Sequence, residues 1–198
     1  ITRPKLLFTQ DLLHRAGKTL PMYAKVLEAQ PPKTLVARTS QEGPELREGD
    51  RYFSDFLVEK DDFESRICDP GDAITILFSS GTTGEPKAIP WNHVTPMKAA
   101  SDGYYHHDIH PDDVVCWPTN LGWMMGPWLI FAALINKATI ALYYGAPLGE
   151  GFGRFVQDAR VTMLGVVPSI VRQWKITACN EAFDWSHIKC FSSTGEAS

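Results

Sequence analysis

Residues 79–87 combine hydroxyls, glycines and a lysine at a spacing that suits phosphate binding. Glycine lets backbone amides approach an anion closely, hydroxyls add donors, and a lysine adds positive charge. The segment is not a Walker A loop, because Glu85 and Pro86 separate Gly84 from the lysine. The expected phosphate ligands are Ser79, Ser80, Gly81, Thr82, Thr83, Gly84 and Lys87.

Patterned elements surround this loop and must position it. The apolar run at 73–78 predicts a buried strand that leads into the loop. The expected helices span 11–16, 20–29, 53–57, 92–102, 125–134, 151–158 and 169–178, with Ser169 as a cap, and the expected strands span 5–9, 34–37, 112–117, 138–143, 163–167 and 189–192. This alternation predicts an α/β fold with two parallel β-sheet subdomains and flanking helices, divided into residues 1–92 and 93–198.

Bulk composition excludes several functional classes. The net charge of −4, without a basic stripe, argues against a nucleic-acid partner. The longest apolar run, at 128–135, is too short to span a bilayer. The four cysteines form no Cys-x-x-Cys pair, which predicts reduced thiols in an intracellular protein and no zinc or redox motif.

A histidine cluster raises the alternative of a metal site. His106, His107 and His110 lie near acidic residues, and both residue types are zinc ligands. Their spacing matches no established metal motif, however, and residues 111–113 are typical of a turn before a strand. We therefore expect no metal ligands among the residues of this chain.

The string Ser-Ser-Gly-Thr-Thr-Gly-x-Pro-Lys, placed after a hydrophobic strand, resembles the phosphate loop of the adenylate-forming superfamily. That superfamily includes acyl-CoA synthetases, luciferases and the adenylation domains of peptide synthetases. This chain departs from the pattern at Ala88, where most members have glycine. The resemblance implies that residues 79–87 bind the phosphates of ATP.

Two further segments resemble the acetyl-CoA synthetase-like branch. Residues 120–126 are similar to its Asp-x-Gly-Trp-x-x-Gly segment, with asparagine in place of the acid, although such a run is also typical of an ordinary core. Residues 194–197 are similar to its Gly-Glu-Pro segment, with alanine in place of proline. The resemblance implies an acyl pocket formed by Trp123, Met124, Met125 and Thr194, and further ATP contacts from Gly195, Glu196 and Ala197.

Residues 15–18 resemble the Arg-x-Gly-Arg segment of acetyl-CoA synthetases, which implies that Arg15 and Lys18 contact the phosphates of coenzyme A. Lysine keeps the charge of the family's second arginine but loses its bidentate fork. A solvated basic helix end is the alternative interpretation of these two residues.

Together these similarities imply an ATP-dependent carboxylate–CoA ligase, resembling the plant acyl-activating enzymes. It would use ATP, Mg²⁺, coenzyme A and a small carboxylic acid of short to medium chain, in the cytoplasm or the peroxisome. We expect the chain to be part of an N-terminal domain that is inactive alone, because the family's catalytic lysine belongs to a C-terminal lid domain. The expected catalytic set within these residues is therefore empty.

Two alternatives stay open at this point. An adenylating enzyme could transfer its acyl group to a carrier-protein thiol or to oxygen instead of coenzyme A. A nucleotide-binding module derived from the same family could also keep the loop without catalysing a reaction. The sequence does not predict an oligomeric state.

Overall fold

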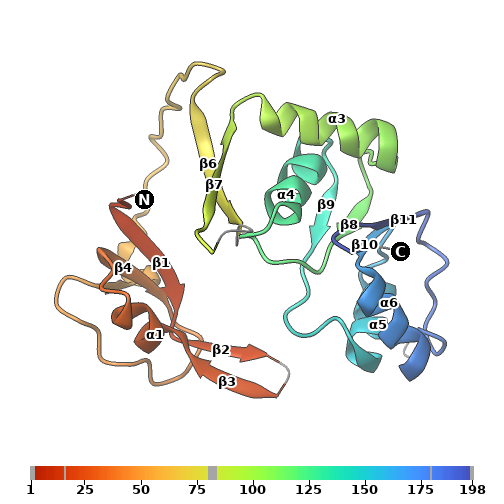
Figure 1. Cartoon of the computed structure of the whole chain (residues 1–198), viewed down its shortest axis with the longest axis horizontal. Helices are drawn as coiled ribbons and strands as arrows, with labels where there is room; N and C mark the ends of the chain where they lie inside the picture. The colour runs from red at the N-terminus through yellow and green to blue at the C-terminus, as the bar shows by residue number, and fades with distance from the viewer. Residues whose placement is uncertain (1–2, 16, 80–83, 179, 197–198) are drawn as a thin grey trace. The chain divides into compact units, whose positions relative to one another are not determined.

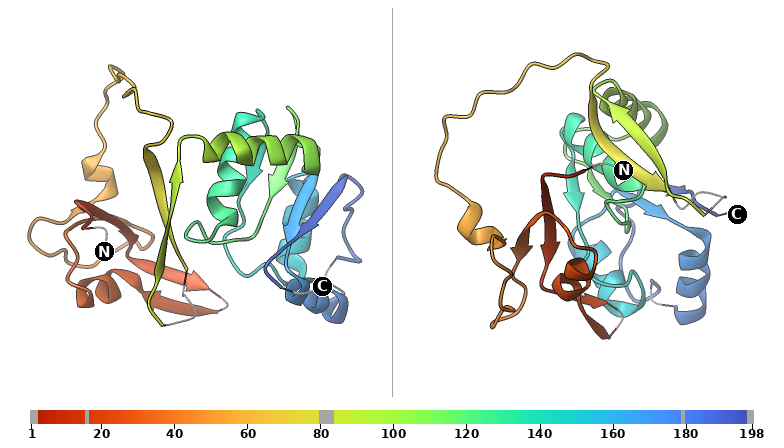
Figure 2. Two further views of the ribbon diagram at one scale, coloured as in Figure 1. Left: turned by 45° about the horizontal axis from the view of Figure 1, so that its top comes forward. Right: turned by 60° about the vertical axis from the view of Figure 1, so that its left-hand side comes forward.

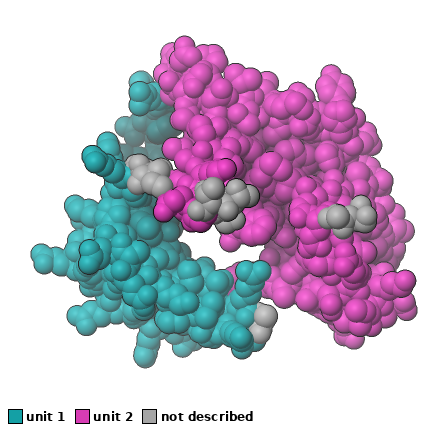
Figure 3. Space-filling view, viewed as in Figure 1, with its two compact units in different colours: residues 1–66 teal, residues 67–198 magenta. Residues whose placement is uncertain are grey.

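The computed structural model describes residues 3–15, 17–79, 84–178 and 180–196. Contacts between Cα atoms divide the chain into two compact units, residues 1–66 and residues 67–198 (Figure 3). The β6–β7 ribbon belongs to the second unit by this criterion, so the division at 66/67 differs from the expected one at 92/93. The expected subdomain boundary concerns the whole protein and stays a prediction.

The first unit contains a small parallel sheet of three strands in the order β1-β4-β5. Its elements are β1 Leu6–Gln10, β2 Leu12–Arg15, β3 Lys18–Pro21, α1 Met22–Glu28, β4 Lys33–Ala37, β5 Arg51–Tyr52 and α2 Phe53–Phe56. The expected parallel pairing of the first and second sheet strands is confirmed, with Phe8 opposite Leu35. Leu35 and Val36 are buried and supply the core of this unit.

The helix expected at residues 11–16 is wrong, because β2 and β3 form an antiparallel hairpin there. Asp11 accepts a hydrogen bond from the Leu12 amide through its side chain, which holds the chain in an extended path. Gly17 has a φ of +74°, a left-handed conformation that suits the turn between the two strands. The helical pattern continues only from Met22, so the expected helix at 20–29 shortens to α1.

Asp11 joins the β1–β2 connection to the segment that follows β4. Its buried carboxylate accepts hydrogen bonds from the backbone amides of Thr39 and Ser40, at 2.8 and 3.1 Å, and from both hydroxyls. Burial alone would raise the pKa of this carboxyl, but the hydrogen bonds from Ser40 and Thr39 outweigh burial and hold the pKa well below its ordinary value of 3.8.

We expect Asp11→Asn to destabilise the full-length protein by about 2 kcal/mol near neutral pH, because an amide cannot accept all of these bonds. The folded-state pKa lies below the unfolded value, so the stabilisation is complete above about pH 4 and declines as the pH falls further. The difference in unfolding midpoint between the two proteins should therefore shrink in acid. Asp61→Asn, at an exposed position, is the control; a difference independent of pH would contradict the prediction.

The second unit contains a four-stranded parallel sheet in the order β11-β10-β8-β9. Its elements are β6 Ala73–Ser79, β7 Lys87–Asn92, α3 Thr95–His107, β8 Val114–Cys116, α4 Met125–Ile135, β9 Thr139–Ala141, α5 Gly149–Asp158, β10 Met163–Val166, α6 Pro168–Thr177 and β11 Cys190–Ser193. The alternation expected from residue 93 onward is confirmed. β6 and β7 form a separate antiparallel ribbon (Figure 2).

Two hydrophobic clusters cover the two faces of this sheet. α3 and α4 pack on one face, where Val115, Leu129 and Met163 are buried, and α5 and α6 lie on the other (Figure 1). Cys116 and Leu164 point to the second face, because side chains alternate along a strand. Both faces are therefore covered, as the hydrophobic strand sequences require. Within the described residues, no helix is both long enough and apolar enough to cross a membrane.

Candidate functional site

A β-hairpin presents the predicted phosphate loop. Ser79 ends β6, Lys87 begins β7, and the two residues face one another across the ribbon. Ser80, Gly81, Thr82 and Thr83 lie outside the described residues. Gly84 has a φ of +88° and open space where a side chain would stand, so only glycine adopts this conformation without strain. The hairpin holds the expected lysine and hydroxyl at the base of the loop, with the lysine exposed.

A cavity of about 510 Å³ lies between one face of α3, the start of α4 and the ends of β8 and β11. Its lining residues are Trp91, Thr95, Lys98, Ala99, Asp102, His106, His107, Trp117, Met124, Met125, Trp128, Ser192 and Thr194. Three of the four predicted acyl-pocket residues, Met124, Met125 and Thr194, meet here. Their role in binding an acyl group stays a prediction.

Trp123, the fourth predicted acyl-pocket residue, lines a second cavity of about 380 Å³ beside the β6–β7 ribbon. Its side chain is 74% exposed, and Ser79 lines the same cavity. Met124 lines both cavities. One methionine thus lies between the hairpin that carries the phosphate loop and the larger apolar cavity.

The turn before α4 sets the direction of these side chains. The Gly122 amide donates a hydrogen bond of 2.8 Å to the Asn120 side-chain oxygen, so asparagine provides an acceptor where the family has an acid. A Cβ on Gly126 would lie 2.5 Å from the Leu121 Cα, so the turn packs directly on the first turn of the helix. This close approach requires glycine and places Met124 and Met125 at the helix start.

Gly195 and Glu196 follow β11 at the carboxyl edge of the parallel sheet, where ligands of open α/β sheets bind. Gly195 has a φ of +88°. The Glu196 carboxylate accepts hydrogen bonds from the amide of Ser169, at 2.9 Å, and from its hydroxyl, at 2.6 Å. The hydroxyl and amide of Ser169 lower the pKa of Glu196. Ala197 lies outside the described residues.

The expected capping role of Ser169 is wrong. Val167 is the N-cap residue of α6, and Ser169 lies inside the first turn. The Glu196 carboxylate accepts the free amide of that turn instead, which satisfies an unpaired donor and suits the positive end of the helix dipole.

Arg15 and Lys18 lie in the first unit, and the cavities lie in the second. The two residues face one another across the β2–β3 hairpin, and both are exposed. Both residues lie on strands, so the alternative interpretation as a basic helix end is wrong. Their assignment to coenzyme A stays a prediction.

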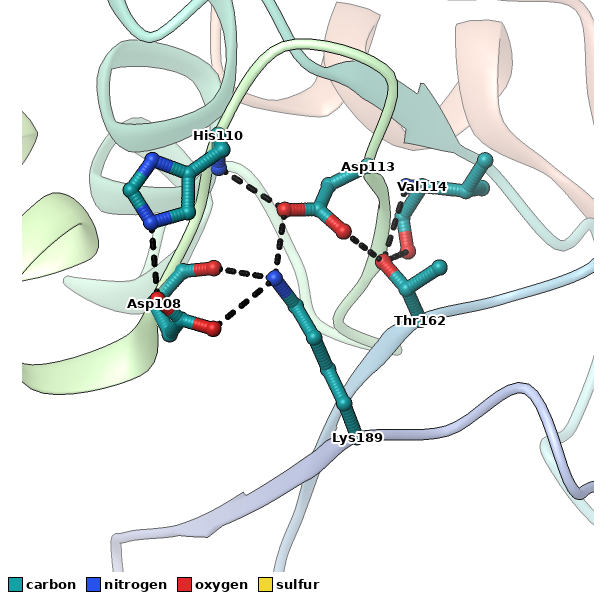
Figure 4. A network of polar contacts seen from close by, with 6 residues as sticks. All are labelled: Asp108, His110, Asp113, Val114, Thr162 and Lys189. Atoms are coloured by element: carbon teal, nitrogen blue, oxygen red, sulfur yellow. Dashed lines mark hydrogen bonds and ion pairs between the residues drawn. The ribbon is translucent and has the colours of Figure 1, made fainter.

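Of the three histidines, His110 takes part in a polar network at the turn before β8. His110 contacts Asp108 at 2.7 Å, and Lys189 connects Asp108 to Asp113, whose other oxygen accepts the Thr162 hydroxyl (Figure 4). Burial favours a higher pKa for Asp113, but hydrogen bonding, first from Lys189, lowers it. These contacts attach the start of β11 to the turn before β8. Within residues 3–15, 17–79, 84–178 and 180–196, no three His, Cys, Asp or Glu side chains gather as metal ligands.

His107 and Ser192 are cavity residues that sequence reasoning did not identify as part of the site. In the sequence, His107 belongs only to the candidate metal cluster, and Ser192 belongs to none of the motifs. A helical spacing could have indicated part of this wall, because Thr95, Lys98, Asp102 and His106 recur every three or four residues along α3.

Comparison with known proteins accords with this geometry. The sequence profile of the family described as "AMP-binding enzyme" matches residues 2–198. The chain is 56% identical to a hexanoyl-CoA synthase of Cannabis sativa and 49% identical to a probable peroxisomal acyl-activating enzyme 17 of Arabidopsis thaliana. In both comparisons the alignment covers 100% of this chain, which spans 28% of the length of each relative.

A solved structure shares the fold. The acetoacetyl-CoA synthetase from Streptomyces lividans superposes with a TM-score of 0.87 at 24% identity. The superposition covers 98% of this chain and 31% of that protein. The α/β architecture with parallel sheets is therefore that of the acetyl-CoA synthetase-like fold.

Proposed function

The chain belongs to the AMP-binding enzyme family, and from this premise we propose that the full-length protein is an ATP-dependent acyl-CoA synthetase. The observation that carries the proposal is the family match over residues 2–198, together with 56% identity to a protein named as a CoA synthase. The cavity lined by Met124, Met125 and Thr194 supports an acyl substrate.

The proposed reaction has two steps. The carboxylate oxygen of the acid attacks the α-phosphorus of ATP. The bond between the α-phosphorus and the oxygen that bridges the α- and β-phosphates breaks, and pyrophosphate leaves with that oxygen. The thiolate of coenzyme A then attacks the carbonyl carbon of the acyl-adenylate, and AMP leaves with the bonding electrons. The first step requires in-line positioning and stabilisation of phosphate charge.

The described residues support binding and orientation. Lys87 and Ser79 at the base of the phosphate loop would bind the outer phosphates, and Gly195 would allow the nucleotide to approach the backbone. Mg²⁺ would arrive with ATP and share the charge of its phosphates. Among the described residues, no three carboxylate, histidine or cysteine side chains gather as a site for this ion.

Coenzyme A is the proposed acceptor, because Arg15 and Lys18 place two cations side by side on one hairpin. We expect the double variant Arg15→Ala, Lys18→Ala to raise the KM for CoA about tenfold in the full-length enzyme, since one charge-assisted bond is worth about 1.5 kcal/mol. Adenylation should be unaffected. The matched control is Lys5→Ala, Lys25→Ala, which removes two exposed cations from the same unit.

An unchanged KM in the Arg15, Lys18 double variant would favour the second candidate, an adenylating enzyme whose acceptor is a carrier-protein thiol or oxygen. Arg15 and Lys18 are the described residues that this proposal assigns to coenzyme A. The non-catalytic module is the third possibility, and it predicts nucleotide binding without any exchange.

The test of the proposed function is ATP–pyrophosphate exchange by the full-length protein against straight-chain acids from two to twelve carbons. Acid-dependent exchange would support adenylation, and thioester formation on adding CoA would support the ligase. A lack of exchange with every acid, despite ATP binding by direct titration, would favour the non-catalytic module.

For the cellular location, we propose the cytoplasm or the peroxisome. The support is that two relatives of Arabidopsis thaliana, each 49% identical over the whole chain, are named as peroxisomal. Fluorescence of a tagged full-length protein beside a peroxisomal marker would decide between these two compartments.

A further inference from the structure

His107 lies at the end of α3, and its ring connects three walls of the larger cavity. One ring nitrogen, Nε2, lies 3.0 Å from the Ser192 hydroxyl of β11. The other, Nδ1, lies 3.2 Å from the Asp102 carbonyl oxygen. The ring packs edge-on against Trp128 of α4, with centroids 4.8 Å apart. A helix, a strand end and a second helix thus hold this side chain in place.

The hydrogen bonds of His107 determine which atoms carry protons. A carbonyl oxygen only accepts, so Nδ1 of the neutral ring donates to Asp102. Nε2 is then an acceptor, and the Ser192 hydroxyl donates to it. Both nitrogens and the hydroxyl proton are therefore paired. His107 and Ser192 can therefore contact a hydrocarbon chain without burying an unpaired hydrogen-bond donor, which would cost free energy.

The geometry of β11 provides a length scale along the cavity. Ser192 and Thr194 are two positions apart, and both line the cavity, as expected for side chains on one face of a strand. The Thr194 amide donates to the Val166 carbonyl oxygen at 3.4 Å, so the ladder with β10 continues to this residue. Two residues of a strand span about 7 Å.

We propose that His107, held by Ser192, is a specificity-determining residue that closes the distal end of the acyl cavity and selects acids of about six carbons, a length that corresponds to the roughly 7 Å between adjacent same-face positions. This inference rests on the proposed function, with the reacting carboxyl group beside Thr194. The acyl chain extends along the β11 face until its terminal methyl group reaches the His107 ring.

The test compares kcat/KM for adenylation of acids from two to twelve carbons in the full-length protein. His107→Ala removes the ring, and we expect the ratio of decanoate to hexanoate activity to rise at least about tenfold, because single methylenes alter specificity by that order. His107→Phe keeps the ring volume and should keep the preference for hexanoate. Ser192→Val adds bulk at the strand and should shift the preference toward butanoate.

Tyr105→Ala is the matched control, since Tyr105 is an exposed aromatic residue of the same helix that does not line the cavity. A uniform fall in activity toward all acids in His107→Ala, with no change in preference in Ser192→Val, would show a packing role only and overturn the inference. Absence of exchange by the unaltered protein would overturn the proposed function and the inference with it. The two failures are therefore distinguishable.

Discussion

Replacing Lys87 with alanine should reduce acid-dependent ATP–pyrophosphate exchange by the full-length enzyme by about 100-fold, the effect of removing one preorganised group that stabilises developing charge. Lys87 is the first residue of β7 and lies opposite Ser79, so the ribbon fixes its backbone at the base of the phosphate loop. The Lys87 side chain is exposed. We therefore expect its removal to lower the exchange activity without changing the unfolding midpoint.

Two variants make this result specific. Lys175→Ala removes an exposed lysine from α6 and should leave exchange unchanged. Lys87→Arg keeps a positive charge and should recover part of the activity, because arginine also binds phosphate but with a different geometry. Full exchange in Lys87→Ala would exclude this lysine from the phosphate site.

Replacing Gly165 with alanine should destabilise the protein by about 3 kcal/mol, at the upper end for overpacking of a core. A Cβ at this position would lie 1.9 Å from Cδ2 of the Trp117 indole. Trp117 is buried in the cluster under α3 and α4 and also lines the larger cavity. The collision must displace either the indole or β10, so we expect a lower unfolding midpoint together with weaker activity toward every acid.

A double-mutant cycle tests the cause of the Gly165 effect. In a Trp117→Ala background the indole is absent. Adding Gly165→Ala should then lower the free energy of unfolding by less than about 1 kcal/mol, because the effects of contacting residues are coupled. Additive losses in the double variant would show that the penalty comes from elsewhere in β10. Ala141→Gly, on strand β9 at the edge of the same sheet, controls for a single methyl change.

Local sequence patterns were sufficient to predict most of the second unit. α4 is apolar nearly all round and is followed by a short strand, so its position was predictable within one residue. The strands at 114–116 and 163–166 were also predictable, because a strand with two covered faces reads as a continuous apolar run.

The missed elements have identifiable physical reasons. β7 contains Pro90 and follows Pro86, and prolines argue against a strand in sequence-based prediction. The β6–β7 ribbon has only two strands, so β7 has one free edge and tolerates the backbone donor that Pro90 lacks. The short run at 11–16 fits helical and strand spacing equally well. Its outcome depends on the hydrogen bonds of Asp11 with Thr39 and Ser40, which lie 28 and 29 positions further along the chain.

The sequence by itself determined the family, the parallel α/β architecture and the motif residues, because a strand, a helix face or a glycine-rich loop is encoded by neighbouring residues. Tertiary structure alone brought Met124, Met125 and Thr194 into one cavity and placed Trp123 in another. It also joined His107 to Ser192, 85 positions away. That contact depends on how α3 packs over the end of β11, a relation that no local period records.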